Sequence, residues 1–426
     1  TRDLTFYVKV KEWAQNSSCS AANVSYFRKA VGYPINNTND IILSNTTYNG
    51  SSSTAYSNDT TPRYRVGRNN SNRVFPGDTI YVYSDSSCST LVTSSSTITS
   101  GSNTWRFVYL DIPTISSDGA YTYYFRMKDS QGHWYPEDCS STTPPSRTYN
   151  LDTVAPDHPT SSNVSFSNPT SSPNTDSTPT LLVNGLEYGD KVHIFKDSNC
   201  STYADSIGTS YGSSLSMTVN SVSEGATNFY IKIADRSGNI KSDCPSSPQI
   251  SYEYIKDPES SDISFTDPTS SPNTDTTPTV RISGLGTGEV ITVYNASGCS
   301  SSNLVGTSSS STSSGQVDIT LSTLNQGVNS LYFTKTKGSA TTTCPSSAQK
   351  SYTVIPTAPT GLSLSSPTDS SGLDKNPSLT VAGITPGHTA YLYTGSNCAN
   401  LVGNATLESN SNGSSVVVTS GDLAAG

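Results

Sequence analysis

The chain has 426 residues and a net charge of −9, with 13% charged and 32% hydrophobic residues. This length is too great for one hydrophobic core and predicts three or four domains of ordinary size. The acidic balance argues against a nucleic-acid-binding protein, which needs a basic face to meet phosphates. No apolar run of 18 residues is present, so the sequence predicts no membrane span.

Short alternating runs of aromatic and β-branched residues predict strands throughout the chain. The run TIYVY at 79–83 and the run NFYIKI at 228–233 are typical examples, and Gly, Pro, Asn and Ser bound such runs. No amphipathic helix of three turns is indicated anywhere. The predicted fold class is all-β.

Four copies of a twelve-residue block reveal an internal repeat. Each copy begins at a glycine and ends at a cysteine eleven residues later: GDTIYVYSDSSC from Gly77, GDKVHIFKDSNC from Gly189, GEVITVYNASGC from Gly288 and GHTAYLYTGSNC from Gly387. A shared strand precedes the last three copies. Its prolines lie 99 residues apart, at Pro179, Pro278 and Pro377, whereas the first copy has an insertion between Pro62 and Gly77.

A second block follows each of the first three copies and ends at another cysteine. The three second blocks are GAYTYYFRMKDSQGHWYPEDC to Cys139, GATNFYIKIADRSGNIKSDC to Cys244 and GVNSLYFTKTKGSATTTC to Cys344. Each consists of an alternating strand, a turn and a second strand. The turns suit hairpins, because Gly and Asn tolerate positive φ and Asp can bond its own backbone.

About 100 residues, about seven short strands and one early and one late cysteine per repeat indicate tandem immunoglobulin-like β-sandwiches. The pattern predicts one disulfide in each complete sandwich: Cys88–Cys139, Cys200–Cys244 and Cys299–Cys344. Each bond would stabilise its domain by ~4 kcal/mol on the chain-entropy model. Zinc is disfavoured as the alternative, because each block has one Cys and the four His are scattered. Recurring pairs predict an oxidising compartment, extracellular or at the cell surface.

Two short motifs carry a resemblance to a known family. The linker DTVAP at 152–156 and the turn DRSGN at 235–239 resemble those of bacterial Ig-like domain repeats in large extracellular adhesins and surface fibre proteins. The resemblance extends over nearly the whole chain and implies a type of module, not a ligand. The linkers at 256–258 and 356–359 depart from the pattern.

The repeat leaves one sandwich divided between the two ends of the sequence. Residues 1–27 match a second block, with Phe6-Tyr7 aligned on Phe229-Tyr230, and they contain Cys19. Residues 356–426 contain a first block with Cys398 and lack the last strands. The predicted organisation is terminal strands at 1–27, sandwiches at 28–152 (with a long insertion), 153–256 and 257–355, and an incomplete sandwich at 356–426.

Two explanations of this split remain open. In the first, residues 1–27 of one copy complete residues 357–426 of the next by donor-strand complementation, and a bridge between Cys398 and Cys19 locks a head-to-tail filament. The partners are then other copies of the chain, and the sequence does not identify a ligand on a host or neighbouring cell. In the second, the sequence is an excerpt from a long repeat adhesin that acts as a spacer or as a module that binds a glycan or a protein.

The sequence contains no constellation of residues that indicates catalysis. The histidines fall in different predicted domains, and no G-x-S-x-G motif accompanies any of them: His133, His158, His193 and His388. The chain is therefore predicted not to be an enzyme and to need no cofactor.

Calcium is the one metal that the sequence suggests, at the linker that contains Asp152 and Asp157. Ca²⁺ takes six to eight oxygen ligands, however, and no other linker has two Asp so close together. A solvated, Pro-rich hinge is the alternative interpretation.

The segment 36–75 is the first candidate for a ligand-facing or glycosylated loop. It contains Tyr and Arg residues (Tyr48, Tyr56, Arg63, Tyr64, Arg65 and Arg68) and the sequons at Asn36, Asn45, Asn49, Asn58 and Asn69. Composition alone accounts for the number of sequons. An ordinary variable loop is the alternative to a binding function here.

Overall fold

The structure is a computed structural model. It describes residues 41–43, 54–67, 74, 76–95, 97, 108–140, 142–205, 207–309, 315–368, 374–409 and 411–423, and the backbone of the strands at 3–27 and 49–50. The chain divides into two compact units. The first holds residues 1–171, 177–222 and 226–252, and the second holds 172–176, 223–225 and 253–426.

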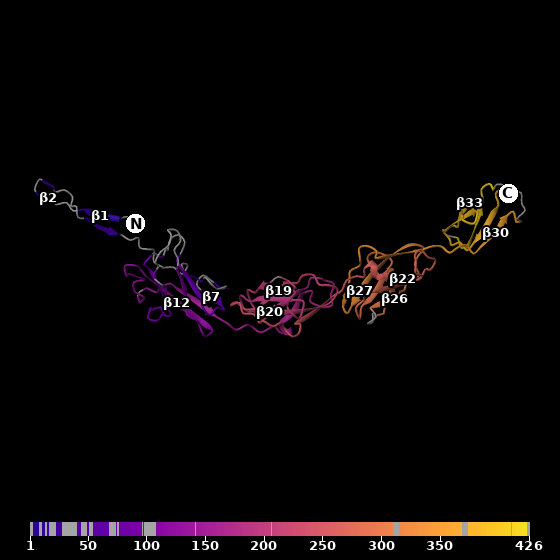
Figure 1. The fold of residues 1–426 in the computed structure, drawn as a ribbon. Coiled ribbons are helices and arrows are strands. Elements are labelled where there is room, and N and C mark those ends of the chain that lie inside the picture. Colours follow the sequence, from indigo (N-terminus) through magenta and orange to yellow (C-terminus); the bar gives the residue numbers. More distant parts are fainter. Residues whose placement is uncertain are drawn as a thin grey trace. The chain divides into compact units, whose positions relative to one another are not determined.

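The second sandwich shows the arrangement of the repeat most clearly (Figure 1). One sheet has the order β15-β16-β19 and the other the order β18-β17-β20-β21. The strands are β15 (Val164–Asn168), β16 (Thr180–Asn184), β17 (Lys191–Phe195), β18 (Gly208–Thr209), β19 (Ser214–Thr218), β20 (Gly225–Ala234) and β21 (Ile250–Tyr254). In immunoglobulin notation the sheets are A-B-E and C′-C-F-G, as expected for the predicted fold class.

The third sandwich repeats the same two sheets. Its A-B-E sheet has the order β22-β23-β26, and in the other sheet the order is β25-β24-β27, with β29 paired to β27. The strands are β22 (Ile263–Asp267), β23 (Thr279–Ser283), β24 (Val290–Tyr294), β25 (Leu304–Thr307), β26 (Gln316–Thr320), β27 (Gly327–Lys337), β28 (Ala340–Thr341) and β29 (Lys350–Val354). The short strand β28 folds back on the end of β27.

The first sandwich differs from the others at its first strand, which is split between the two sheets. The segment β5 joins the sheet β11-β8-β5, and β7 pairs in parallel with the last strand, β14. The strands are β5 (Ile41–Leu43), β6 (Asn49–Gly50), β7 (Thr54–Ser57), β8 (Arg63–Val66), β9 (Thr79–Tyr83), β10 (Leu91–Ser94), β11 (Val108–Asp111), β12 (Gly119–Lys128), β13 (Trp134–Tyr135) and β14 (Ser146–Leu151).

A turn after the first strand recurs in the sandwiches. Asn174 and Asn273 each form a parallel bridge to the last strand of their own sandwich. Beyond this bridge, a carboxylate oxygen of Asp275 accepts the backbone N–H of Thr277 at 2.8 Å, and Asp59 accepts that of Thr61 at the same distance. The aspartate therefore caps the turn that leads into the next strand.

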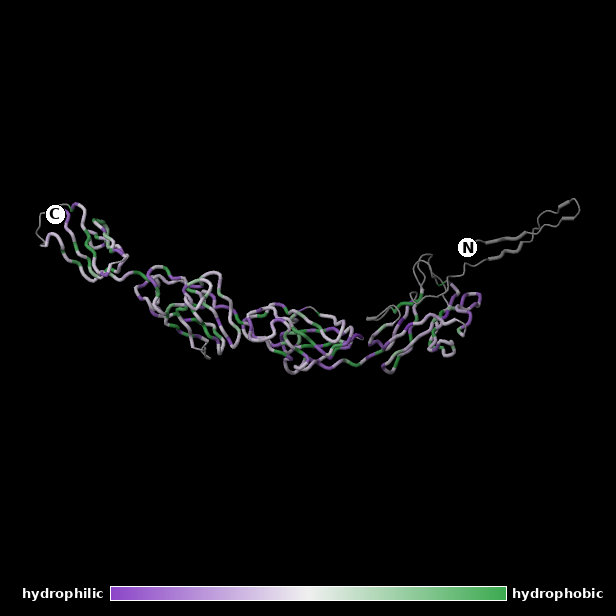
Figure 2. The backbone as a smooth tube through the Cα atoms, turned by 180° about the vertical axis from the view of Figure 1, so that it is seen from behind, coloured by the Kyte–Doolittle hydropathy of each residue, from purple (hydrophilic) through white to green (hydrophobic). Residues whose placement is uncertain are grey.

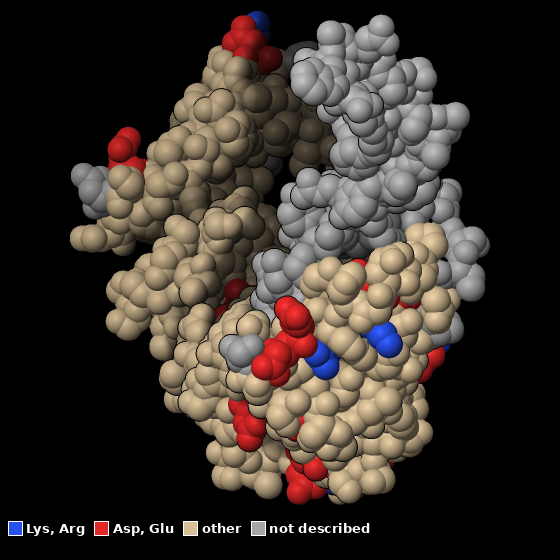
Figure 3. Space-filling model, turned by 90° about the vertical axis from the view of Figure 1, so that its left-hand side faces the viewer, with Lys and Arg blue, Asp and Glu red and all other residues tan. Residues whose placement is uncertain are grey.

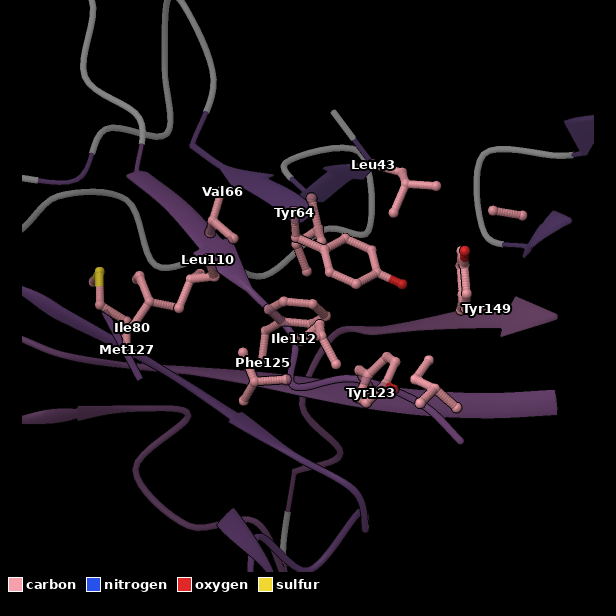
Figure 4. Packing of buried hydrophobic residues seen from close by; sticks show 14 of the residues in the cluster. Leu43, Tyr64, Val66, Ile80, Leu110, Ile112, Tyr123, Phe125, Met127 and Tyr149 are labelled. Carbon is pink, nitrogen blue, oxygen red and sulfur yellow. The ribbon is translucent and has the colours of Figure 1, made fainter. Parts of the chain in front are cut away.

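Each complete sandwich has its own core between its two sheets. In the first, Tyr64 lies against Phe125, with ring centroids 5.2 Å apart, and Tyr149 closes one end of the cluster (Figure 4). The third sandwich buries Phe333 and Tyr352 completely. Hydrophobic and hydrophilic residues alternate along the strands, which is why each sheet has one buried face (Figure 2).

The structure forms the three disulfides that the repeat predicts. Cys88–Cys139, Cys200–Cys244 and Cys299–Cys344 join Cα atoms 6.0, 5.7 and 5.6 Å apart, within the usual range for this bond. Each bond connects the turn after the C strand to the segment between the F and G strands. This placement ties one end of the C′-C-F-G sheet to the chain that follows it.

Candidate functional site

The last domain has only part of the sandwich pattern in the residues that the structure describes. It forms a sheet β30-β31-β34 and a second sheet of two strands, β32-β33. The strands are β30 (Gly361–Ser366), β31 (Ser378–Ala382), β32 (Thr389–Thr394), β33 (Asn400–Thr406) and β34 (Ser415–Thr419). By position these are, in chain order, the A, B, C, C′ and E strands. In the complete sandwiches the C strand pairs with F on its other edge, and among the described strands β32 has no such neighbour in its sheet.

Apolar side chains of this domain are more exposed than the residues at matching core positions of the complete sandwiches. Leu362 is 59% exposed, whereas the residues 99 and 198 positions before it, Ile263 and Val164, are 2% and 6% exposed. Leu392 is half-buried, whereas Val293 is fully buried at the same place in the third sandwich. The A-B-E sheet therefore presents an apolar inner face that its own second sheet covers incompletely.

The first strands of the chain form the complementary part of the pattern. The strands β1 (Asp3–Tyr7) and β4 (Asn23–Phe27) pair antiparallel in a sheet of two strands, and β2 (Lys11–Glu12) pairs with β3 (Gln15–Asn16). The complete sandwiches have the same order. In the third, the first half of the F strand β27 pairs with the G strand β29, and the end of β27 forms a small hairpin with β28. Residues 3–27 thus have the strand order of an F-G hairpin.

The strand orders of the two partial sheets are complementary. The last domain supplies C′-C as β33-β32, and the hairpin supplies F-G as β1-β4, which together give the C′-C-F-G order of the second sandwich. The match to β20 and β27 places Val8 at the position of Ile231 and Phe333, and both of those residues are fully buried. Edge strands with unpaired backbone groups and an open apolar face are the usual requirements for strand addition.

The four cysteines that follow the C strands share one backbone conformation. Their φ angles are 56° at Cys88, 51° at Cys200, 45° at Cys299 and 49° at Cys398. Three of these residues form disulfides, and Cys398 is exposed with a free thiol. Cys398 therefore already has the conformation that its three counterparts adopt in their bonds. Cys19, its predicted partner, lies outside the described residues.

The aspartates proposed as calcium ligands have other partners. The Asp157 carboxylate lies 2.5 Å from the Lys241 ammonium, which lowers the pKa of Asp157, and an oxygen of Asp152 accepts the backbone N–H of Val154. No group of three or more His, Cys, Asp or Glu with metal-binding geometry occurs among the described residues. The linker thus has an ion pair and a turn cap at the two positions named from the sequence.

The four histidines lie in three domains and are not brought together. The His133 ring faces Asp129 in the turn after β12, and the His158 ring faces Asp243. His193 lies on β17 beside Tyr203, and His388 precedes β32. Burial lowers the pKa of His193. None of them contacts a serine or cysteine in the arrangement of a catalytic triad in the described part of the chain.

Where the structure describes the segment 36–75, predicted as a ligand-facing or glycosylated loop, much of it forms strands. The strands β5, β7 and β8 run through it, and the Tyr64 side chain is in the core. Arg63 forms a bidentate ion pair with Asp111 across the sheet. Alternation with period two, visible in RYRV, could have indicated a strand here. Tyr48, Arg68 and the sequon asparagines except Asn49 and Asn58 lie outside the described residues; only the backbone is described at Asn49, and Asn58 is exposed.

One side-chain cluster in the first unit was not anticipated from the sequence. The guanidinium of Arg236 lies 3.7 Å from the centre of the Tyr56 ring and 5.2 Å from that of Tyr188, beside a cavity of about 440 Å³. Asn239 donates a hydrogen bond to the Asp152 carbonyl at 2.7 Å. The turn at 235–239, predicted as a hairpin turn, thus also contacts residues of the preceding repeat.

In Figure 3 the visible face is largely uncharged, and acidic side chains are scattered over it among the residues that the structure describes. In the described residues no helix is long and apolar enough to cross a membrane.

Comparisons with known proteins found structural similarities only. No family model and no curated protein matches the sequence. Among solved structures, a biofilm-associated protein BSP domain is similar with 13% identity and a TM-score of 0.18, covering 74% of this chain and 68% of that one. Invasin, a bacterial integrin-binding protein, is similar with 12% identity and a TM-score of 0.25, covering 90% and 74%. An α-L-rhamnosidase from Streptomyces avermitilis is similar with 8% identity and a TM-score of 0.15, covering 91% and 56%.

Proposed function

We propose that this chain is a structural and adhesive component of an extracellular fibre, in which copies join head to tail by strand complementation. The hairpin at 3–27 of one copy completes the last sandwich, residues 356–423, of the next. The observation that carries this proposal is the pair of two-stranded sheets, β33-β32 and β1-β4, which together make the C′-C-F-G sheet of a complete sandwich.

The physical reason for joining is the surface that each part leaves uncovered. Leu362 of the last domain is 59% exposed, whereas its equivalent Ile263 in the complete third sandwich is 2% exposed. An F strand added at the free edge of β32 would extend that sheet and would cover the inner apolar face of the β30-β31-β34 sheet. Burial of apolar surface stabilises by about 25 cal/mol per Å², and the new ladder would satisfy the backbone groups of the edge.

The three disulfides support an extracellular setting. Disulfides form and persist in oxidising compartments and are rare in the cytosol. A contact in which one end of a subunit binds the opposite end of the next does not close on itself, so it produces a filament. The proposal therefore connects the compartment, the split sandwich and an extended assembly.

A second candidate function rests on the same observation. Two partial sandwiches would also result if this chain were part of a longer array of repeats that acts as a spacer in an adhesin. In that case each partial sandwich would be completed by the neighbouring repeat of the same polypeptide. Association between separate copies of the chain would then have no role.

Sedimentation of the purified 426-residue chain tests the proposal. Val8→Asp places a charge at the position that matches the fully buried Ile231 and Phe333, and we expect it to abolish concentration-dependent association. The matched control is Thr5→Asp, because Thr5 matches the exposed Asn228, and this variant should associate as the original chain does. A chain that stays monomeric across the accessible concentration range would contradict strand complementation between copies.

A further inference from the structure

A buried tyrosine occupies the same position on the G strand in all three complete sandwiches. Tyr149, Tyr252 and Tyr352 are fully buried, and each follows a Thr or Ser. The Tyr352 hydroxyl donates to the backbone carbonyl of Asp275 at 3.0 Å, and the Tyr149 hydroxyl donates to that of Asp59. The tyrosine thus fastens the last strand to the turn that follows the first strand.

The ring of the same tyrosine packs on the first strand. The Tyr352 ring centre lies 5.0 Å from that of Phe265, and Tyr252 lies 5.1 Å from Phe166. In the last domain the residue at this position of the first strand is Leu364, 99 residues after Phe265, and it is 37% exposed.

The carbonyl that would accept the hydroxyl is already in place in the last domain. A carboxylate oxygen of Asp374 accepts the backbone N–H of Asn376 at 2.9 Å, as Asp275 accepts that of Thr277 at 2.8 Å. Leu423 donates its N–H to the Lys375 carbonyl at 2.9 Å, and the equivalent bond in the third sandwich measures 2.8 Å. The turn of the last domain therefore adopts the backbone arrangement of a complete sandwich without its last strand.

The register of the first hairpin places Tyr26 at the position of these tyrosines. On the F strand of the third sandwich, Tyr332 pairs with the C strand, and the residue three positions earlier, Asn329, faces Tyr352. In the hairpin, Tyr7 aligns with Tyr332, and the residue three positions before Tyr7 is Leu4, which faces Tyr26. Ser25 precedes Tyr26, as Ser351 precedes Tyr352.

We propose that Tyr26 fixes the register of the joint between copies: its hydroxyl donates to the Asp374 carbonyl of the next copy, and its ring packs on Leu364. This inference rests on the proposed function. A slip by one residue would turn the Tyr26 side chain to the other face of the strand. The tyrosine therefore favours one register among several that the alternating strand would otherwise permit.

The test uses the full chain with Cys19→Ser and Cys398→Ser, so that association is reversible and is measured by sedimentation. Tyr26→Phe removes the hydroxyl and keeps the ring, and we expect the association constant to fall roughly three- to tenfold, the usual range for one hydrogen bond. Tyr352→Phe makes the same change inside a complete sandwich and should leave the association constant unaltered.

A double-mutant cycle tests the ring contact separately. Tyr26→Ala and Leu364→Ala should be non-additive, with a coupling of at least about threefold in the association constant, since contacting residues couple. Leu401→Ala, on β33 of the other sheet, should combine additively with Tyr26→Ala. Suppose that the reference chain associates, that Tyr26→Phe leaves the association constant unchanged, and that Tyr26→Ala and Leu364→Ala are additive. The proposed role of Tyr26 is then wrong, and strand complementation stands. If the reference chain does not associate, strand complementation itself fails.

Discussion

At the scale of single residues, aspartates after the C strand organise the cysteine turns. An Asp197 oxygen accepts the backbone N–H of Ser201 at 3.2 Å, and its other oxygen accepts that of Thr202 at 2.6 Å. Desolvation raises the pKa of Asp197, but the hydrogen bonds outweigh it and lower the pKa to about 2. In the first sandwich, the hydroxyl of Ser87 and the backbone N–H groups of Ser89 and Thr90 likewise lower the pKa of Asp85.

The lowered pKa of Asp197 predicts an acid-dependent loss of stability in the second sandwich. Because the folded pKa lies below the unfolded value, this contribution is present above pH ~4 and is lost as the pH falls toward 2. We expect Asp197→Asn to lower the melting temperature at pH 6 and to flatten its decline between pH 5 and pH 2. Calorimetry of both chains at several pH values measures this. Parallel declines in the two chains would rule out the turn as the source.

The buried Phe333 predicts a large local effect. Truncation of a fully buried phenylalanine costs about 3–5 kcal/mol, so Phe333→Ala should destabilise the third sandwich by that amount. The measurement is the denaturant midpoint of the third-sandwich transition. Val328→Ala is the matched control, because Val328 lies on the same strand and is 73% exposed; it should change stability by less than about 0.5 kcal/mol.

At the scale of elements, equivalent strands have unequal surroundings. On β22, Ile263 is buried in a cluster with Leu331 and Tyr352 of the F and G strands, whereas every residue of β30 is exposed. Apolar residues at alternate positions therefore form part of the core in the third sandwich and an exposed face in the last domain. A strand with an open apolar face stabilises an assembly more than it stabilises the isolated chain.

This contrast predicts opposite results for matched substitutions on β22 and β30. Ile263→Ala should cost about 2–5 kcal/mol in the stability of the third sandwich and should leave association unaffected. Leu362→Ala should change the stability of the unassembled chain by less than about 0.5 kcal/mol and should weaken association. Denaturant unfolding and sedimentation of both variants provide the comparison. Equal effects of Leu362→Ala on both measurements would contradict a site that is filled only on assembly.

At the scale of the whole molecule, the repeat places one cysteine on each side of the proposed contact between copies, Cys398 on one copy and Cys19 on the other. Cys398 is exposed and has the backbone conformation of the three bonded cysteines after the C strands. In the proposed assembly it faces the segment that contains Cys19. A bond there would convert a reversible contact into a covalent one, as the intrachain bonds do within each complete sandwich.

We predict that assembled fibres give a ladder of covalent multimers on a denaturing, non-reducing gel and a single band near 45.0 kDa with thiol. Cys398→Ser should abolish the ladder and preserve association under native conditions, because the apolar contact remains. A free Cys19 in intact fibres, detected by alkylation and mass spectrometry, would refute the bond between subunits.

The sequence by itself determined the repeat, the β-sandwich class and the pairing of six cysteines. Each follows from short-range regularity: alternation along a strand fixes which residues share a face, and the spacing of Cys88 and Cys139 recurs with little change in the next two repeats. The same regularity predicted that residues 1–27 and 356–426 are parts of one module, from the match of Phe6-Tyr7 to Phe229-Tyr230.

Only the tertiary structure decided which residues these strands place together. It showed that Tyr64 is a core residue and not part of a binding loop, that Asp157 pairs with Lys241, and that Arg236 lies over Tyr56. It also showed the link between the G-strand tyrosine and the turn after the first strand, which lie 77 residues apart in the third sandwich. Local patterns set the face of a side chain, but its partner is set by sheet order and by the path of the turns, which bring distant segments into contact.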